Sequence, residues 1–338
     1  MPQDRPLHAT VTFSGATPAA LALEATRHHQ AMGTLMDHRA AGMDAEAALD
    51  EVEREIARLE RLLSRFDPAS EISRVNAAAG RGPQPVSPDT FEILTIARRC
   101  AARTRGRYDP TAGPLAALWR AASLPAPPDR ATLLRARALV NWRDLLLDAH
   151  RGTAALRRPG QSLDLGGIGK GYAADRLRAL YARRGIVSAC SSLGGNVLAV
   201  GERPGGGPWR VGIQHPRAEG ELIGAIEIVD GTVVTSGDYR RYATTPDGRR
   251  HHHIVDPRTG QPAESGLAGV TVVGECSTEA DALATALFVA GRRRAARMLA
   301  GYPGAEAVLV ERTLDIWITP GLLGRFLPAA GGTVRLLE

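Results

Sequence analysis

The chain has 338 residues, of which 44% are hydrophobic and 23% are charged. This composition excludes an intrinsically disordered chain and a small disulfide-stabilised module, because it supplies enough apolar surface for a large core. The net charge of +6 is weak evidence for nucleic acid, since the basic residues are scattered and mostly lie beside acids, and we expect no such partner. One basic residue stands out, because Lys170 is the only lysine among 42 basic side chains.

Residues 1–30 are predicted to form an N-terminal appendage, in which a short extended piece precedes a helix from Pro18 to His29. We expect residues 31–338 to form a single domain with two lobes. The first residues contain neither an apolar signal-peptide core nor an early cysteine for lipidation, which favours a cytoplasmic location. No run reaches the roughly 18 apolar residues of a membrane span, so none is expected.

Three helices are predicted in the first half of the chain. Residues 44–66 carry apolar side chains at helical spacing, and Asp67-Pro68 ends the segment. Ser87 and Pro88 form an N-cap followed by a first-turn proline, which predicts a helix as far as Gly106. A shorter helix is expected near 130–137, inside an irregular and proline-rich stretch.

The second half of the chain mixes strands and helices. Strands are expected at 162–165, 186–200, 209–214, 222–229, 232–235 and 270–273, helices at 170–184, 278–290 and 292–300, and a hairpin over 308–318. Because these elements show no regular βαβ period, the pattern favours an α+β fold over a doubly wound sheet.

A glycine-rich segment runs from Asp164 to Gly171, after a predicted strand and at the start of a predicted helix. Backbone amides in such a place favour phosphate, although the segment matches neither a Walker A loop nor the dinucleotide-binding glycine pattern. A tight strand-to-helix turn is the alternative. Lys170 favours the anion site, since a lysine at a helix N-terminus opposes the helix dipole unless a negative ligand compensates.

Asp281 and Thr285 lie four residues apart on an otherwise apolar helix, so their oxygens face the same side. A buried carboxylate needs a partner, and one carboxylate, one hydroxyl and a carbonyl suit Mg²⁺. The alternative is that Asp281 is a first-turn charge and that Thr285 bonds back to its own helix.

Three histidines, His251 to His253, precede the turn sequence Asp256-Pro257-Arg258-Thr259-Gly260. Successive side chains on a strand alternate faces, so the three histidines do not converge on one metal. One of them on the inward face is a candidate general base, and an exposed polar run is the alternative.

Taken together and in order, these segments resemble the ApbE family of FAD:protein FMN transferases, over about residues 30–320. The matching stretches are AMGTLMDHRA (31–40), SRFDPASEISRVN (64–76), GRYDPTAGPLAALW (106–119), LDLGGIGKGYAADRL (163–177), SSLGGNVLAVG (191–201), PWRVGIQHP (208–216), VVTSGDYRRY (233–242), HIVDPRTGQP (253–262) and DALATALFVAG (281–291). The resemblance implies a T-fold-related α+β architecture, with mixed sheets packed against helices and FAD bound in a cleft between two lobes.

The resemblance also implies a reaction, in which FMN passes from FAD to a Ser or Thr of a target protein with Mg²⁺ present and AMP released. Its implied metal ligands are the carbonyl of Gly167, the carboxylate of Asp281 and the hydroxyl of Thr285. The implied FAD contacts are Met32, Phe66, Arg107, Tyr108, Asp109, Asp164, Lys170 and Val255. His253 matches the family's H-x-x-D-P-R-T-G stretch and is the candidate base, while Lys170 adds a charge beside the phosphates.

Two further activities fit the same residues: an FAD pyrophosphatase that gives FMN and AMP, and a non-catalytic FAD-binding maturation protein. Targets of the family carry an acceptor motif of the form [DS]-x-x-[ST]-G-A-[ST]. Ser14-Gly15-Ala16-Thr17 matches it in part, with Val11 at the acidic position. Thr17 is therefore either a self-acceptor or an ordinary helix N-cap.

Overall fold

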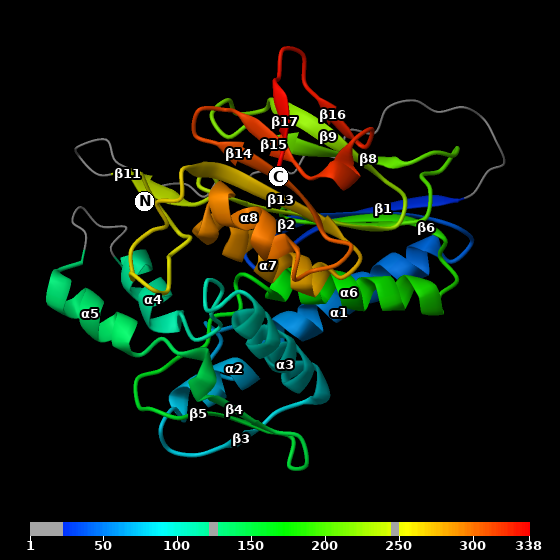
Figure 1. The fold of residues 1–338 in the computed structure, drawn as a ribbon. Coiled ribbons are helices and arrows are strands. Elements are labelled where there is room, and N and C mark those ends of the chain that lie inside the picture. The colour runs from blue at the N-terminus through cyan, green and yellow to red at the C-terminus, as the bar shows by residue number, and fades with distance from the viewer. Residues whose placement is uncertain (1–22, 122–127, 245–249) are drawn as a thin grey trace.

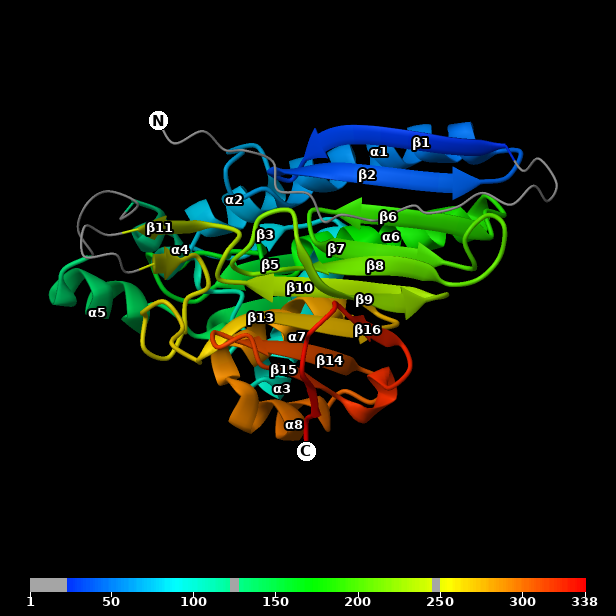
Figure 2. The same ribbon diagram turned by 90° about the horizontal axis from the view of Figure 1, so that it is seen from above.

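The computed structural model describes residues 23–121, 128–244 and 250–338. Within these ranges, a nine-stranded sheet forms the centre of the molecule (Figure 1). In spatial order its strands are β1 (Glu24–Ala31), β2 (Thr34–Ala41), β6 (Ser188–Leu193), β7 (Asn196–Val200), β10 (Gly231–Gly237), β13 (Leu267–Gly274), β14 (Glu306–Glu311), β15 (Ile316–Ile318) and β17 (Val334–Leu336). Neighbours pair antiparallel except β15 and β17, and Figure 2 shows the strands side by side from above.

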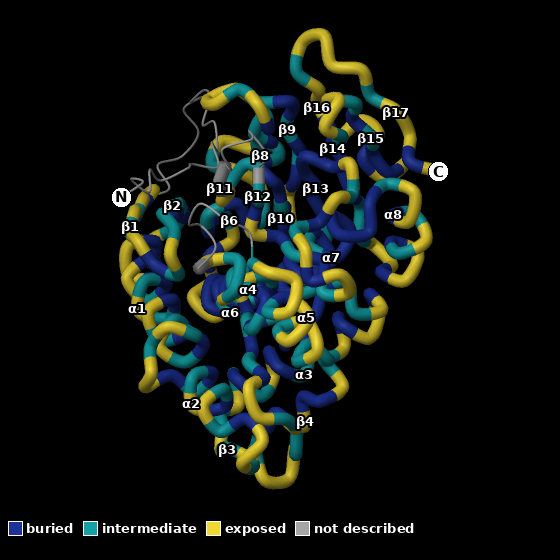
Figure 3. The backbone as a smooth tube through the Cα atoms, turned by 90° about the vertical axis from the view of Figure 1, so that its left-hand side faces the viewer, coloured by how far each residue is buried: buried dark blue, intermediate teal, exposed yellow. Residues whose placement is uncertain are grey.

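Four helices cover one face of this sheet: α1 (Ala45–Leu63), α6 (Gly169–Arg183), α7 (Ser277–Ala290) and α8 (Arg292–Leu299). In α1 the buried side chains, from Ala45 and Leu49 through Val52, Ile56 and Leu59 to Leu63, are apolar and recur every three or four residues, which confirms the helix predicted at 44–66. Almost every residue of α7 is buried, as the dark tube in Figure 3 shows. This helix packs on β10 and β13 and against α6, so its polar residues lie inside the protein.

A small sheet lies over the other face of the large one. It contains β16 (Phe326–Pro328), β9 (Leu222–Ile228) and β8 (Trp209–Gln214). Trp209, Val211 and Ile213 alternate inward along β8 and pack against Val233 and Val308 of the large sheet.

The remaining elements lie beyond the helix layer and at one side. Below the helices are α2 (Glu71–Ala77), α3 (Pro88–Arg103) and a sheet of β3 (Gln84–Pro85), β5 (Thr153–Leu156) and β4 (Leu145–Asp148). To the side are α4 (Gly113–Ala121), α5 (Arg130–Ala138) and the pair β11 (Tyr242–Thr244) and β12 (Arg250–His252). Two 3₁₀ turns, Trp142–Asp144 and Pro320–Leu322, complete the described elements.

The α+β class is confirmed, and so are most predicted elements. The N-cap prediction holds, because the side chain of Ser87 accepts a hydrogen bond from the N–H of Thr90. The segment 186–200 is a hairpin, β6 and β7, that turns at Gly194-Gly195. The C-terminal hairpin is formed by β14 and β15.

Two predictions were wrong. Residues 24–29 of the expected helix 18–29 belong to β1, which pairs along its whole length with β2; residues 18–22 lie outside the described residues. Pairing with β2 outweighs local helix propensity there. The strand expected at 162–165 is also absent, and that part of the described chain makes only an isolated bridge between Ala112 and Ser162.

No helix in the described ranges is both long and apolar enough to cross a bilayer. Of the three cysteines, Cys100 and Cys190 are buried as expected of small apolar residues, whereas Cys276 is exposed, and all three are free. The partial acceptor motif, Ser14 to Thr17, lies outside the described residues.

Candidate active site

The glycine-rich segment forms the turn that begins α6. The carboxylate of Asp164 shapes this turn, because Oδ1 accepts a hydrogen bond of 2.8 Å from the N–H of Gly166. Arg65 pairs with the same carboxylate, and the N–H of Asp164 donates to the carbonyl of Pro110. Ile168 precedes the helix and contributes no side-chain cap, and the N–H of Gly169 donates instead to the carbonyl of Leu165.

The start of α6 touches α7 at Gly171. Its N–H donates a 3.0 Å hydrogen bond to Oδ2 of Asp281, a carboxylate that is only 4% exposed. A Cβ at this position would lie 2.8 Å from Cβ of Asp281 and would overlap the carbonyl oxygen of Ser277. Glycine is therefore needed for the two helices to approach this closely.

Asp281 and Thr285 face the turn together. A Cβ at Gly167 would lie 3.1 Å from Oγ1 of Thr285, so the backbone of the turn passes directly over this hydroxyl. The structure shows Oγ1 of Thr285 at 3.3 Å from the hydroxyl of Ser236 on β10. Gly167 thus lies against Thr285, and Gly171 lies against Asp281, so the turn contacts both of these polar residues of α7.

The alternative for Asp281, a charge in the first turn of its helix, does not fit. Helix α7 begins at Ser277, and Asp175 of α6 accepts hydrogen bonds from the N–H groups of Ser277 and Thr278 at 2.9 and 2.8 Å. Asp175 therefore caps α7, and Asp281 lies a turn further on with its carboxylate in the interior.

Burial and charge act against each other at this place. Burial raises the pKa of Asp281, while Lys170, the N–H of Gly171 and the amide of Asn196 lower it. Burial lowers the pKa of Lys170, Asp281 raises it, and Arg241 and Arg240 lower it again. Lys170 and Asp281 hence lie within electrostatic reach of each other, and two further arginines share the site.

His253 follows β12 and has a defined tautomer. Its Nδ1 lies 3.1 Å from the carbonyl oxygen of Arg241, which also accepts the backbone N–H of His253. Because a carbonyl only accepts, the neutral ring carries its proton on Nδ1, and the lone pair is on Nε2. Desolvation lowers the pKa of His253 to about 4, more than this hydrogen bond raises it, and the charges of Arg241 and Lys170 lower it too.

The other two histidines point elsewhere: strand alternation predicts this for His252, whereas His253 differs from His251 because it lies beyond the end of β12. His252 is buried, its Nε2 lies 3.1 Å from the carbonyl oxygen of Ala263, and its ring meets Phe288 edge-on. His251 stacks on Trp119 at 5.5 Å between ring centroids. Only His253 is within reach of the charges around Lys170.

The tyrosine-aspartate turn lies beside the same place. A Cβ at Gly167 would lie 3.5 Å from the ring of buried Tyr108. The carboxylate of Asp109 accepts three hydrogen bonds from its own surroundings, from the N–H and hydroxyl of Thr111 and from the N–H of Trp142. Asp109 therefore shapes the loop that carries Tyr108, and its role as an FAD contact stays a prediction.

Four other predicted FAD contacts lie further out. The guanidinium of Arg120 lies over the exposed ring of Phe66, with its central carbon 4.5 Å from the ring centroid. Phe66 also lines a pocket of about 460 Å³. Met32 adopts a left-handed φ of 50°, and its N–H donates to Glu60, which lines the same pocket. Arg107 lies near Asp256 and Arg258 of the turn at 256–260. Burial is the main cause that lowers the pKa of Arg107, Arg258 lowers it further, and Asp256 raises it. Val255 bridges to Pro262 in that turn.

Sequence reasoning missed several cations around the site. Arg240 donates to the carbonyl of Gly194, and Arg241 to the carbonyl of Gly33 at 3.2 Å. Arg120 lies near Arg65 and Asp164, whose charges both act on it. Desolvation is the main cause that lowers the pKa of Arg120, Arg65 lowers it further, and Asp164 raises it. The matching stretch VVTSGDYRRY was the available signal, but nothing in the sequence showed where its arginines point.

The site has donors with unmet hydrogen-bonding capacity, which is an observation in favour of an anionic ligand. Among the described residues, buried atoms without a hydrogen-bond partner include Nε of Arg240, Nδ2 of Asn196 and Oη of Tyr108. Within the same ranges, no three His, Cys, Asp or Glu side chains form a metal-binding group. A cation here would therefore depend on hydroxyl and backbone oxygens beside Asp281.

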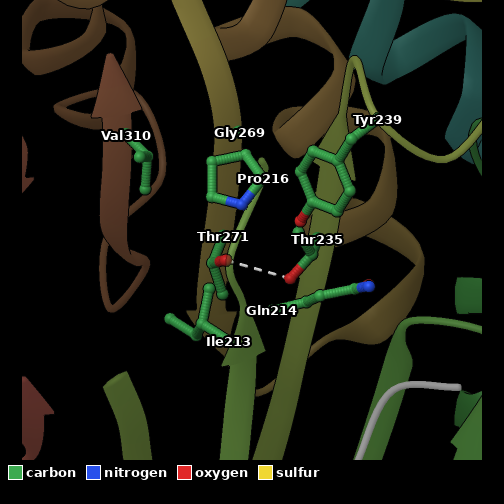
Figure 4. Close-up of a pocket in the computed structure, with 8 residues that line it drawn as sticks. All are labelled: Ile213, Gln214, Pro216, Thr235, Tyr239, Gly269, Thr271 and Val310. Atoms are coloured by element: carbon green, nitrogen blue, oxygen red, sulfur yellow. Dashed lines mark hydrogen bonds between the residues drawn. The ribbon is translucent and has the colours of Figure 1, made fainter. Parts of the chain in front are cut away.

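A second hollow, between the two sheets, is closed. Thr235 and Thr271, joined by a 2.9 Å hydrogen bond, line it together with Ile213 and Val310 (Figure 4), and the space among the lining residues is too small for a water molecule. On β10, Ser236 faces α7 while Thr235 faces this hollow, as strand alternation requires.

The fold defines an α+β protein in which a buried carboxylate on α7 lies beside the glycine-rich start of α6 and a group of basic side chains. The chain belongs to the ApbE family, whose model matches residues 32–309. The FAD:protein FMN transferase of Klebsiella pneumoniae (strain 342) is 35% identical over 289 residues, covering 85% of this chain and 89% of that protein. The protein of the same name from Escherichia coli (strain K12) is 31% identical, covering 86% and 85%.

Solved structures show the same likeness. The ApbE protein of Thermotoga maritima superposes with a TM-score of 0.81 at 29% identity, covering 89% of this chain and 99% of that one. The flavin transferase ApbE of Vibrio cholerae gives 0.81 at 27% identity, covering 90% and 99%. The family resemblance expected from the sequence is confirmed.

Proposed function

We propose that this protein transfers FMN from FAD to a serine or threonine hydroxyl of a target protein and releases AMP. The curated relatives carry the name of this activity. One observation in the chain itself carries the proposal: a neutral histidine, the single lysine and a buried carboxylate lie within electrostatic reach of one another. This set suits a phosphoryl-type transfer, which needs a base, a cation and an oxygen site.

FAD is the donor in this proposal, and its diphosphate would lie over the start of α6. Lys170 supplies a point charge there, and the N-terminal end of the α6 dipole adds a partial positive charge. The exposed ring of Phe66, with Arg120 stacked on it, offers a surface for an aromatic ring of the cofactor.

His253 is the proposed base. The acceptor hydroxyl gives its proton to Nε2 of His253 as its oxygen bonds to the phosphorus of the FMN half. The bond from that phosphorus to the bridging oxygen breaks, and this oxygen leaves with AMP. The carbonyl of Arg241 holds the proton on Nδ1, so that Nε2 is free to accept.

We also propose that Mg²⁺ binds at the carbonyl of Gly167, the carboxylate of Asp281 and the hydroxyl of Thr285. These are hard oxygens of the kind that Mg²⁺ prefers, and Gly167 and Thr285 are in contact. When bound, the ion neutralises charge on the diphosphate. Burial raises the pKa of Asp281, and the nearby Lys170 and the N–H of Gly171 oppose burial by favouring the ionised form, which is the form that a cation binds.

The test is a transfer reaction with purified protein, FAD, Mg²⁺ and a target containing the proposed acceptor motif, [DS]-x-x-[ST]-G-A-[ST]. We expect the target to gain the mass of FMN while AMP appears in equal amount, and a target with alanine at the last motif position to gain none. FMN and AMP without an adduct would instead identify an FAD pyrophosphatase. FAD binding without turnover would identify a carrier.

A further inference from the structure

The turn between β6 and β7 is built around one arginine. Gly194 and Gly195 adopt positive φ values of 59° and 105°. A Cβ at Gly195 would overlap the guanidinium of Arg240, so glycine leaves the room that this side chain occupies. Arg240 in turn donates from Nη1 to the carbonyl of Gly194. Its guanidinium is thereby fixed in place before any ligand arrives.

One N–H group of this guanidinium has no acceptor among the described residues. Nε of Arg240 is buried and, among the described residues, has no hydrogen-bond partner. Nδ2 of Asn196, which comes directly after the turn and is only 2% exposed, also has no partner within hydrogen-bond distance there, although the amide is close enough to Asp281 to act on its carboxylate. Leaving two such donors unpaired in the interior is costly, so a ligand that accepts from both would be favoured.

Both donors belong to the surroundings of Asp281. Asn196 lies on β7 opposite Val234 of β10, the strand that also carries Ser236 beside Thr285. The N–H of Thr235 donates to the carbonyl of Gly195, which ties the turn to β10. Asn196 and Arg240 are both near enough to Asp281 to act on its carboxylate.

We infer that Arg240 and Asn196 form a second arm of the phosphate site, opposite Lys170, and donate hydrogen bonds to the diphosphate of FAD. The inference deepens the proposed function and rests on it for the identity of the ligand. A planar guanidinium held by Gly194 presents a directed pair of N–H groups to phosphate oxygens, whereas Lys170 acts as a mobile point charge. The two arms supply cations from separate elements, α6 and the loop after β10.

Binding measurements test the inference without catalysis. Arg240→Gln and Asn196→Ala would be compared with the parent protein for FAD and ADP, which contain a diphosphate, and for riboflavin and adenosine, which contain none. We expect Arg240→Gln to weaken FAD and ADP by roughly 10- to 100-fold, as for other hydrogen bonds to charged groups, and to leave riboflavin and adenosine unchanged. Arg240→Lys should recover only part of the lost affinity, because lysine keeps the positive charge but not the planar pair of N–H donors.

Arg54→Gln is the matched control, since it removes the same charge from an exposed position on α1. Circular dichroism at the binding temperature checks that each variant is folded. Equal affinities for FAD and ADP in Arg240→Gln and the parent, or an equal loss for all four ligands, would overturn the inference. Failure of FMN transfer by the parent protein would count against the proposed function and leave the binding comparison intact.

Discussion

The carboxylate of Asp281 is held against the start of α6 by Gly171, whose N–H donates a 3.0 Å hydrogen bond to Oδ2. Through this contact the glycine-rich turn and the polar side of α7 become one site. It depends on the missing side chain of Gly171, because any Cβ would meet Asp281 and Ser277.

Gly171→Ala is therefore expected to separate the two helices. Overpacking of this kind lowers the free energy of unfolding by about 1–3 kcal/mol, and the carboxylate of Asp281 loses its donor. Urea unfolding at neutral pH measures the effect. Gly169→Ala is the control, because a Cβ there meets nothing within 4 Å. Equal stabilities for the two variants would contradict the contact.

Asp281→Asn should separate stability from function. Burial raises the pKa of Asp281, so its ionised form lowers stability as pH rises through that pKa. The neutral amide keeps an acceptor for Gly171, and the free energy of unfolding at pH 7 should stay level or rise. The rate of Mg²⁺-dependent FMN transfer should fall by at least about 100-fold. Loss of a residue that only supports a metal ligand already costs about 10- to 100-fold in metal affinity or activity, and Asp281 is a proposed ligand itself.

The thermal midpoint gives this variant a second readout. Mg²⁺ should raise the midpoint of the parent protein through linkage and leave that of Asp281→Asn unchanged. A fully active variant would show that the metal site lies elsewhere.

The pH profile tests His253. Its pKa of about 4 keeps the ring neutral well below pH 6.5, so the transfer rate should be level from pH 8 to 6 and decline only towards pH 4. The unfolded ring titrates near 6.5, so the stability that His253 contributes is lost as pH falls from about 6.5 to 4, and circular dichroism must accompany each rate.

His253→Gln is the companion variant. It should lower the rate by roughly 10²- to 10⁴-fold at every pH and leave FAD affinity unchanged. An acid limb centred near pH 6.5 in the parent, or an active glutamine variant, would remove His253 from the base role.

Lys170→Arg tests why one lysine stands among so many arginines. A guanidinium is larger and planar and cannot replace a compact ammonium over a glycine turn, so we expect kcat/KM for FAD to drop by about tenfold with the fold intact. Steady-state kinetics over a range of FAD concentrations measure the drop. Arg54→Lys makes the reverse exchange at an exposed site and should leave kcat/KM for FAD unchanged. Unchanged kinetics in Lys170→Arg would make this lysine incidental.

Local signals predicted a large part of the fold. The apolar spacing of α1 and the Ser87-Pro88 cap of α3 act within one helix, so they can be seen in the sequence and are confirmed. The helix predicted at 18–29 failed over residues 24–29, because they pair with β2 and strand pairing overrides local propensity. The strand at 162–165 failed because its backbone pairs elsewhere: the N–H and carbonyl of Leu163 bond the side chain of Asn76, and the N–H of Asp164 donates to the carbonyl of Pro110.

The candidate site divides in the same way. The sequence by itself placed Lys170 after a glycine turn and Asp281 and Thr285 on one side of a helix, because both relations are local. Only the tertiary structure decided that Gly171 touches Asp281, that Arg241 fixes the tautomer of His253, and that Arg240 rests on the turn at Gly194. Such contacts join residues far apart along the chain. Their geometry follows from how sheets and helices pack, which no local spacing records.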